Sequence, residues 1–308
     1  MPRFTDIKGF LIGHATHPSE ATGCTVILCP EGAVAGVDVR GSAPGTRETD
    51  LLRPGYMIRE VHGVVLSGGS AFGLRTADGV VQFLHQHGFG YDARGIRVPI
   101  VPAAVIFDLR PGRSVLLPSV EMGYQACQNA SSRYEEGLVG AGRGATVGKV
   151  LGLEQAMAGG FATATLTLPG KVLVSAAVVV NALGDVVDPS TGKIVAGARK
   201  RRGRGFADSF EVLKKGLTAS PLAPTNTTLA VVATNARLDK EQANKLAWMA
   251  QNGIARATRP AHTMHDGDVV FALSRGDRTA DVSVLGEAAA QAVSAAIVRA
   301  VQLTNDLD

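Results

Sequence analysis

The chain alternates between short apolar runs rich in β-branched residues and segments in which apolar residues recur every three or four positions. Runs of the first kind predict β-strands, whereas the second spacing predicts amphipathic helices. The predicted strands lie at residues 23–28, 32–39, 61–66, 100–107, 159–168, 172–182, 228–234 and 269–273. The predicted helices lie at residues 74–87, 119–130, 208–215, 239–252 and 286–303.

Two local signals indicate how these elements connect and pack. Pro169-Gly170 separates two consecutive predicted strands and therefore predicts a hairpin. Asp239 is the predicted N-cap of the helix at 239–252, and Gly253 is its predicted end. Hairpins among mixed helices and strands favour an α+β or layered sandwich over a pure βαβ series.

The segment from residue 188 to 225 is polar, basic and loop-like, apart from the short predicted helix. It leads through Asn226 and Thr227 into an apolar strand, so a hydroxyl residue stands directly in front of that strand. If the bond between Asn226 and Thr227 were cut, Thr227 would carry a free α-amine beside its own hydroxyl. Such an amine has an ordinary pKa of about 7.7–8.0, and threonine with a free amine is an activated nucleophile.

The same residues have two other interpretations. Asn226-Thr227-Thr228 is also an Asn-x-Thr sequon for N-glycosylation. A turn followed by a strand, moreover, needs no catalytic explanation. The motif alone therefore leaves a nucleophile, a glycosylation site and a plain strand entry as alternatives.

Composition restricts the class of protein more than its function. The 308 residues are 45% hydrophobic and 19% charged, which is typical of a globular protein and permits one large or two smaller domains. The 37 glycines recur between apolar runs and indicate tight turns and close backbone approaches. The three cysteines contain no C-x-x-C pattern, so they support neither a disulfide framework nor a zinc site.

The net charge of +4 is mild, and its one dense basic cluster is Arg199-Lys200-Arg201-Arg202-Gly203-Arg204. No aromatic residue interleaves with this cluster, so it lacks a stacking platform for nucleic acid, and we expect a solvated loop or a subunit contact. The N-terminus has no signal-peptide pattern, and no run of 18 apolar residues predicts a membrane span. We therefore expect a cytoplasmic protein, in which the sequon would have no role.

Two glycine-rich segments are similar to phosphate-binding loops but lack required residues. In the segment 144–150, Arg143 stands where a P-loop needs its first glycine, and Val150 replaces the metal-binding Ser or Thr. Residues 68–73 follow a strand and open a helix, but they do not have the G-x-G-x-x-G spacing. We therefore expect no nucleotide cofactor.

Seven segments in a fixed order carry a much more specific signal. They are RGSAPGTRETD at 40–50, LSGGSAFGL at 66–74, IVPAAVIFD at 100–108, GAGRGATVGK at 140–149, VVNALGD at 179–185, NTT at 226–228 and DGD at 266–268. In this order they resemble the DmpA-type aminopeptidases, peptidase family S58. That family includes L-aminopeptidase/D-esterases, β-peptidyl aminopeptidases and nylon-oligomer hydrolases. The resemblance extends from about residue 12 to residue 303.

The resemblance implies a four-layer αββα sandwich, an α+β fold like that of the N-terminal nucleophile hydrolases but with a different strand connectivity. It implies one domain, 1–308, that cuts itself between Asn226 and Thr227 into an α-chain, 1–226, and a β-chain, 227–308. It also implies that such αβ units assemble into tetramers.

The resemblance further implies a role for five side chains of this sequence. Thr227 matches the nucleophile, and Asn181 matches an asparagine whose amide stabilises an oxyanion. Lys149 matches a lysine that orients the nucleophile or lowers the pKa of its amine. Asp266 and Asp268 match an acidic pair that would hold the nucleophile's amine and bind a substrate's ammonium.

Two details place the sequence within the family. A threonine nucleophile together with Asp-Gly-Asp is closer to the nylon-oligomer hydrolases than to the aminopeptidases, which carry serine as the nucleophile and Ser and Glu at the two acidic positions. Phe107 stands where some relatives have tyrosine, which puts a phenol-assisted step in doubt.

The resemblance therefore implies an autoprocessed amide hydrolase that cuts a peptide-like substrate through an acyl-enzyme, with no metal or cofactor. Two alternatives stay open. One is an uncut ligand-binding or assembly protein with the same fold, and the other is an acyltransferase in which an amine replaces water as the acceptor.

Overall fold

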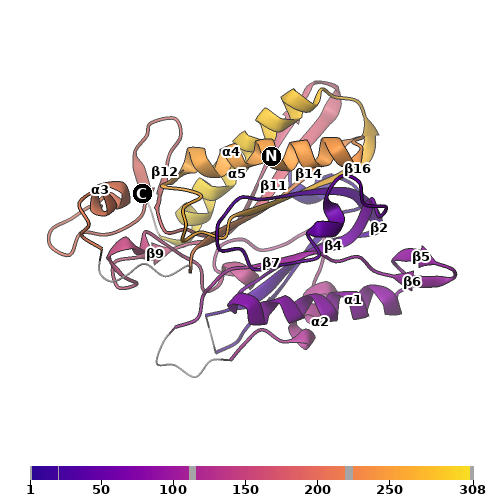
Figure 1. The fold of residues 1–308 in the computed structure, drawn as a ribbon, viewed down its shortest axis with the longest axis horizontal. Helices are drawn as coiled ribbons and strands as arrows, with labels where there is room; N and C mark the ends of the chain where they lie inside the picture. Colours follow the sequence, from indigo (N-terminus) through magenta and orange to yellow (C-terminus); the bar gives the residue numbers. More distant parts are fainter. Residues whose placement is uncertain (1, 20, 111–115, 219–224, 306–308) are drawn as a thin grey trace.

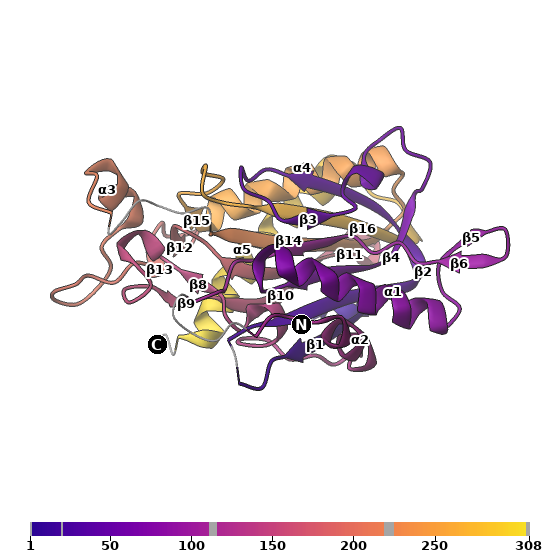
Figure 2. The same ribbon diagram turned by 60° about the horizontal axis from the view of Figure 1, so that its bottom comes forward.

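Helices cover both outer faces of the molecule, and strands fill its middle (Figures 1 and 2). The computed structural model describes residues 2–19, 21–110, 116–218 and 225–305. One face carries α4 (Lys240–Ala257) and α5 (Val282–Thr304), and the opposite face carries α1 (Thr76–Gln86) and α2 (Val120–Gln128). The short α3 (Ser209–Lys214) lies at one end.

Most strands belong to one hydrogen-bonded sheet with the order β10-β11-β14-β16-β2-β4-β7-β3, in which β1 also pairs with β2. Its strands are β1 (Leu11–Thr16), β2 (Gly23–Val39), β3 (Thr46–Arg47), β4 (Glu60–Ser67), β7 (Ala103–Val105), β10 (Gly160–Leu168), β11 (Val172–Asn181), β14 (Thr227–Ala236) and β16 (Val269–Arg278). Smaller sheets join β5 (Tyr91–Ala93) to β6 (Ile96–Val98), β8 (Thr146–Val147) to β9 (Met157–Ala158), and β12 (Asp185–Val187) to both β13 (Ile194–Ala196) and β15 (Thr258–Arg259).

The long strand β2 is shared by two halves of the main sheet, which pack face to face. Its first part pairs with β1 and its second part with β16, while its register against β4 shifts between Leu28 and Ala33. Side chains of a strand alternate between its two faces. Ile27 therefore faces the other half of the sheet, whereas Val26 and Leu28 face the α1–α2 layer.

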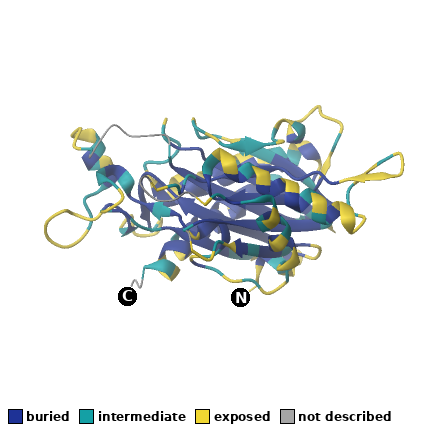
Figure 3. Ribbon diagram, turned by 90° about the horizontal axis from the view of Figure 1, so that it is seen from below, coloured by how far each residue is buried: buried dark blue, intermediate teal, exposed yellow. Residues whose placement is uncertain are grey.

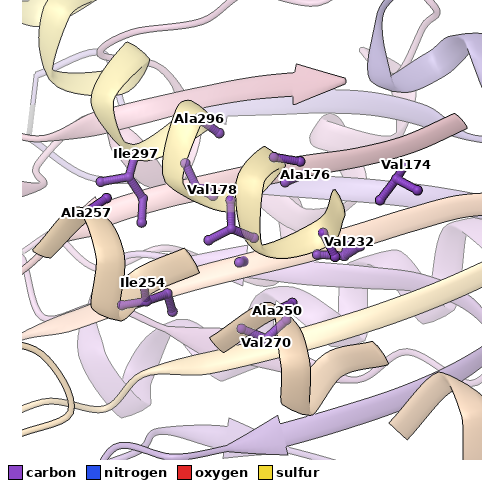
Figure 4. Packing of buried hydrophobic residues seen from close by; sticks show 14 of the residues in the cluster. Val174, Ala176, Val178, Val232, Ala250, Ile254, Ala257, Val270, Ala296 and Ile297 are labelled. Atoms are coloured by element: carbon purple, nitrogen blue, oxygen red, sulfur yellow. The ribbon is translucent and has the colours of Figure 1, made fainter. Parts of the chain in front are cut away.

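Three hydrophobic clusters separate the four layers. The first joins α4 and α5 to the sheet through residues such as Val178, Val232, Val270, Ile254 and Ile297 (Figure 4). The second lies between the two halves of the sheet and includes Phe161, Val179, Val231, Phe271, Ile27 and Leu66. The third joins α1 and α2 to β2 and β4. Exposed residues lie mainly in loops, in the β5–β6 hairpin and on the outer sides of the helices (Figure 3). The predicted α+β fold with αββα layers is thus confirmed.

Most predicted elements are present, and the hairpin between β10 and β11 is confirmed by their antiparallel register. Several boundaries were wrong. The strands predicted at 23–28 and 32–39 are one irregular strand, β2, and the strand predicted at 100–107 is reduced to β7. α5 begins at Val282, after the N-cap Asp281. Residues 219–224 of the predicted loop at 188–225 lie outside the described residues.

Among the described helices, α5 alone is long and apolar enough by composition to cross a membrane. Two-thirds of that stretch, 67%, is buried inside the protein. Ala296 and Ile297 of α5 belong to the cluster shared with β11 and α4, as Figure 4 shows. The apolar character of this helix is therefore accounted for by its place in the core.

Gly253 does not end α4, as the sequence predicted, but sits inside it where α4 crosses α5. A Cβ at this position would lie 2.3 Å from the carbonyl oxygen of Ala290 and 2.7 Å from Cβ of Val293. The glycine is therefore kept for close helix packing, and the helix continues to Ala257 because its apolar face still meets the core.

We expect Gly253→Val to lower the free energy of unfolding by about 1–3 kcal/mol, because the added methyl groups force α4 away from α5. Ala255→Val, at an exposed position of the same helix, is the matched control and should cost only about 0.5 kcal/mol of helix propensity. Urea unfolding of both variants makes the comparison. Equal losses would show that the helix crossing does not require glycine.

Candidate active site

The predicted nucleophile stands at the start of a central strand. Thr227 is the first residue of β14, and the register with β11 places it opposite Asn181. Thr227 is 5% exposed and Asn181 is fully buried. On the other side, β14 runs parallel to β16, whose pairing begins directly after Asp268. The fold thus brings residues distant in sequence to one end of the neighbouring strands β11, β14 and β16.

The peptide bond between Asn226 and Thr227 is surrounded by groups suited to cutting it. Thr227 Oγ1 donates a hydrogen bond to the carbonyl oxygen of Asn226 at 2.5 Å. The backbone N–H of Gly267 donates to the same oxygen at 2.8 Å. A Cβ on Gly267 would lie 2.8 Å from Thr227 Oγ1, so only glycine lets this backbone approach so closely. A hydroxyl and a fixed amide donor therefore meet at one carbonyl.

Asn181 connects this carbonyl region to Lys149. Its Oδ1 accepts from Lys149 Nζ at 2.8 Å and from the backbone N–H of Thr146 at 3.0 Å. Its Nδ2 donates to the carbonyl oxygens of Phe107, at 3.2 Å, and Thr225, at 3.3 Å. Because Oδ1 is occupied by two donors, the amide orientation is fixed and Nδ2 points toward the chain that precedes the nucleophile.

Lys149 binds both the side chain and the main chain of Asn181, since Nζ also donates to the Asn181 carbonyl oxygen at 2.9 Å. The residue is partly exposed, but its ammonium group is surrounded by protein atoms. This burial lowers the pKa of Lys149 to about 7, and the carboxylates of Asp266 and Asp108 oppose the shift only in part. Lys149 therefore changes its charge near neutral pH.

Asp268 anchors the strand that carries the nucleophile. Its Oδ1 accepts from the backbone N–H of Thr228 at 2.6 Å. Its Oδ2 accepts from Nδ1 of His262 at 2.8 Å and from the backbone N–H of the same residue at 3.2 Å. Both oxygens are thus bound by protein donors, and the expected contact of Asp268 with a substrate ammonium stays a prediction.

Asp266 is the second carboxylate of the pair. It is 2% exposed, and burial, together with the neighbouring carboxylate of Asp268, raises the pKa of Asp266. The backbone N–H and the hydroxyl of Thr263 oppose this shift by donating to Oδ2, at 2.8 and 2.6 Å. Asp266 also faces Lys149, whose pKa its charge raises. The pair is therefore a structural and electrostatic unit.

The segments that carried the family resemblance converge on these residues. Backbone N–H groups of Arg40 and Gly41 donate to the Asp268 carbonyl oxygen. The Phe107 carbonyl meets Asn181, and the next residue, Asp108, accepts from the N–H of Gly69 at 2.7 Å. The segment 144–150, excluded above as a P-loop, instead supplies the Thr146 and Lys149 donors to Asn181.

Three further residues at this site were not singled out from the sequence. Gly267 supplies the amide donor, and His262 and Thr263 bind the two carboxylates. Asp-Gly-Asp was visible as a motif, but which backbone group its glycine presents depends on the fold. Among the described residues, no group of three or more His, Cys, Asp or Glu side chains could hold a metal ion.

Comparison with known proteins identifies the family to which this site belongs. The model of peptidase family S58 matches residues 3–308. The chain belongs to peptidase family S58. It is 44% identical to an uncharacterized aminopeptidase of Mycobacterium leprae, over 92% of this chain and 82% of that protein. It is 30% identical to the 6-aminohexanoate-oligomer endohydrolase of Paenarthrobacter ureafaciens, over 97% of this chain and 86% of that protein.

A solved structure supports the fold. The L-aminopeptidase D-Ala-esterase/amidase of Ochrobactrum anthropi, described as a variant of the Ntn hydrolase fold, matches with a TM-score of 0.68 at 19% identity. The match covers 97% of this chain and 85% of that one. The family membership and this likeness confirm the resemblance that the sequence showed. The S58 chain is an enzyme that hydrolyses amide bonds, with an Ntn hydrolase fold.

The lowered pKa of Lys149 predicts how stability depends on pH. Between pH 7 and the ordinary value of 10.5 the unfolded chain binds a proton at this lysine that the folded chain does not, so stability rises with pH in this window. Below pH 7 both states are protonated and the contribution is constant.

We therefore expect the free energy of unfolding of the unmodified protein to rise relative to that of Lys149→Met as the pH rises from 7 to 10. The size of the shift is a few kcal/mol, at about 1.4 kcal/mol for each unit of pKa change. Urea unfolding of both proteins in a Thr227→Ala background, across pH 6 to 10, measures it. A difference that stays constant over that range would contradict a lysine that titrates near 7.

Proposed function

We propose that this S58 chain activates itself by cutting the bond between Asn226 and Thr227 and then acts as an N-terminal-threonine amide hydrolase. The observation that carries the proposal is the carbonyl of Asn226, which contacts both Thr227 Oγ1 and the N–H of Gly267. The cut yields an α-chain of residues 1–226 and a β-chain of residues 227–308. Self-cleavage of this kind is also typical of the family.

Self-cleavage begins when the Thr227 hydroxyl attacks the carbonyl carbon of Asn226. The hydroxyl proton passes to the amide nitrogen as the C–N bond breaks, which leaves an ester on Oγ1 and a free amine on Thr227. Water then hydrolyses the ester and leaves a carboxylate on Asn226. The N–H of Gly267, at 2.8 Å from the carbonyl oxygen, stabilises the negative charge that develops there.

Substrate hydrolysis uses the same hydroxyl with a different base and a different oxyanion donor. The freed amine of Thr227 accepts the hydroxyl proton as Oγ1 attacks the carbonyl carbon of the substrate amide. The proton passes to the leaving amine as the C–N bond breaks, and water then hydrolyses the resulting acyl-enzyme to a carboxylate and restores the hydroxyl. In the continuous chain, Asn181 Nδ2 donates to the Thr225 carbonyl oxygen. After the cut, Thr225 lies next to a new chain end, and the movement of that end releases Nδ2 to bind the oxyanion of a substrate.

The charged residues act by holding these groups in place. Lys149 fixes the amide of Asn181 by donating to its Oδ1, so that Nδ2 stays directed toward the nucleophile. Asp268 holds the backbone N–H of Thr228, which is the residue that tethers Thr227 once the bond before it is cut. Asp266 supplies negative charge near Lys149.

The substrate class is a peptide-like amide or an oligoamide. This class is supported by two relatives, of which one is named as an uncharacterized aminopeptidase and the other as a 6-aminohexanoate-oligomer endohydrolase. The threonine nucleophile with Asp266 and Asp268 favours the oligoamide branch. Following the family resemblance, we also propose a tetramer of αβ units that needs no metal or cofactor; the cytoplasmic location expected from the sequence stays a proposal.

We expect the purified protein to show two chains on a denaturing gel, with intact masses that place the cut before Thr227 and a β-chain that begins Thr-Thr-Leu-Ala. Thr227→Ala should leave one uncut chain because the nucleophile is lost. Thr228→Ala, which removes the neighbouring hydroxyl, is the matched control and should still be cut. A single full-length chain after long incubation of the unmodified protein would support the uncut binding protein instead.

We expect Asn181→Asp to lower kcat by about 10²–10³ in the cut enzyme, because it removes the oxyanion donor but keeps an acceptor for Lys149. Its self-cleavage should be affected less, since Gly267 serves that step. Assays on 6-aminohexanoate oligomers, β-peptides and amino-acid p-nitroanilides identify the substrate on which kcat and KM are then measured. Full activity of Asn181→Asp would remove this residue from the mechanism.

A further inference from the structure

Two adjacent residues, His262 and Thr263, hold the two carboxylates of the Asp-Gly-Asp segment in the same way. Each donates its backbone N–H and its side chain to a single carboxylate oxygen. His262 binds Oδ2 of Asp268, and Thr263 binds Oδ2 of Asp266. Gly267 thus lies between two carboxylates, each of which has its Oδ2 bound by two donors of one residue.

The backbone of His262 is adapted to this arrangement. Its φ of +55° lies in the left-handed region, where Asn, Asp and His are enriched among non-glycine residues and most others are disfavoured. The conformation lets the N–H and the ring Nδ1 of one residue converge on the same oxygen, at 3.2 and 2.8 Å. Nδ1 must carry a proton to donate to a carboxylate, which assigns the Nδ1–H form or the imidazolium to this ring.

The same loop also holds the residue before the nucleophile. The backbone N–H of Asn226 donates to the carbonyl oxygen of His265 at 3.3 Å, and its Nδ2 donates to that oxygen at 3.1 Å. The Gly267 N–H then donates back to the Asn226 carbonyl oxygen. Residues 262–268 thus surround the bond that we propose is cut, and their conformation decides where its donors lie.

We propose that His262 and Thr263 are positioning residues, a clamp that fixes the Asp-Gly-Asp segment so that the Gly267 N–H meets the Asn226 carbonyl and Asp268 meets the Thr228 N–H. The inference rests on the proposed self-cleavage at Thr227. Neither residue reaches the reacting atoms in the described contacts, so their effect passes through Gly267 and Asp268. Displacing reacting groups by about 1 Å costs roughly 10²-fold in rate, so loss of the clamp has a large effect.

The clamp can be tested with pairs of variants that differ in side-chain donation. His262→Gly keeps the left-handed backbone but removes the ring donor, whereas His262→Asn tolerates the same backbone and keeps an N–H donor. Thr263→Val removes the hydroxyl with little change of shape, whereas Thr263→Ser keeps it. Met264→Ala is the control, because Met264 is the next residue and is 75% exposed.

We expect His262→Gly and Thr263→Val to slow self-cleavage by ten- to a hundredfold and to lower kcat of the cut enzyme with KM changed less than threefold. His262→Asn, Thr263→Ser and Met264→Ala should stay within about threefold of the unmodified protein. Self-cleavage is followed by intact mass over time, at a temperature well below the Tm of every variant. A purely structural role would lower Tm and leave these rates unchanged.

Three outcomes would overturn the clamp. Unchanged rates in both His262→Gly and Thr263→Val would show that side-chain donation to the carboxylates is unnecessary. A His262→Asn protein as slow as His262→Gly would show that an N–H donor at this position does not hold the segment. A large rise in KM with unchanged kcat would indicate substrate binding instead. If the unmodified protein does not cut itself at all, the proposed self-cleavage is wrong; this outcome differs from a failure of the clamp, in which the unmodified protein and all variants are cut at the same rate.

Discussion

The pairing of β14 with its two neighbours is the constraint on which the site depends. Antiparallel register with β11 sets Thr227 opposite Asn181, and the parallel run with β16 begins directly after Asp268. At the edge of that ladder, the carboxylate of Asp268 accepts from the Thr228 N–H. A shift of β14 by one residue would turn its apolar side chains to the wrong cores and remove the hydroxyl from the site. The same burial that stabilises the fold therefore fixes the chemistry.

Burial of charge is the second constraint. Hydrogen-bond donors and opposite charges at the site offset the cost of burying its carboxylates and its lysine. Asp266 and Asp268 are each 2% exposed, and two neighbouring buried carboxylates would repel each other without donors. Backbone and side-chain donors of His262 and Thr263 satisfy them, and Lys149 supplies the nearby positive group. Burial lowers the pKa of Lys149 while the carboxylates raise it, so its charge depends on the whole group. Removal of any one side-chain partner takes a donor or a compensating charge from a buried group, which is costly in an interior.

The pattern of predicted strands and helices indicated an α+β or layered sandwich, whereas the four αββα layers and the five site residues were implied by the family resemblance. The nearly continuous apolar run at 172–182 reflects a strand buried on both faces, and the helical spacing in 286–303 reflects a helix with a buried face. Gly253 shows where such reasoning ends, since a helix-ending residue and a helix-crossing residue look alike until the partner helix is known. The same holds for Gly267 and His262. Gly267 contacts the Asn226 carbonyl and His262 contacts the Asp268 carboxylate, and no spacing rule along the chain predicts either contact.

The topology also explains how a cut enzyme would stay whole. The segment after residue 226 supplies β14, α4, β15, β16 and α5, and its two strands of the main sheet, β14 and β16, are adjacent in the middle of that sheet. They are flanked by β11 on one side and by β2 on the other, both from the segment before the cut. Their side chains fill the two cores above and below the sheet, together with those of β10 and β11. Separating the two chains would therefore expose most of the apolar interior, so one broken peptide bond frees the Thr227 amine without releasing the strand that carries it.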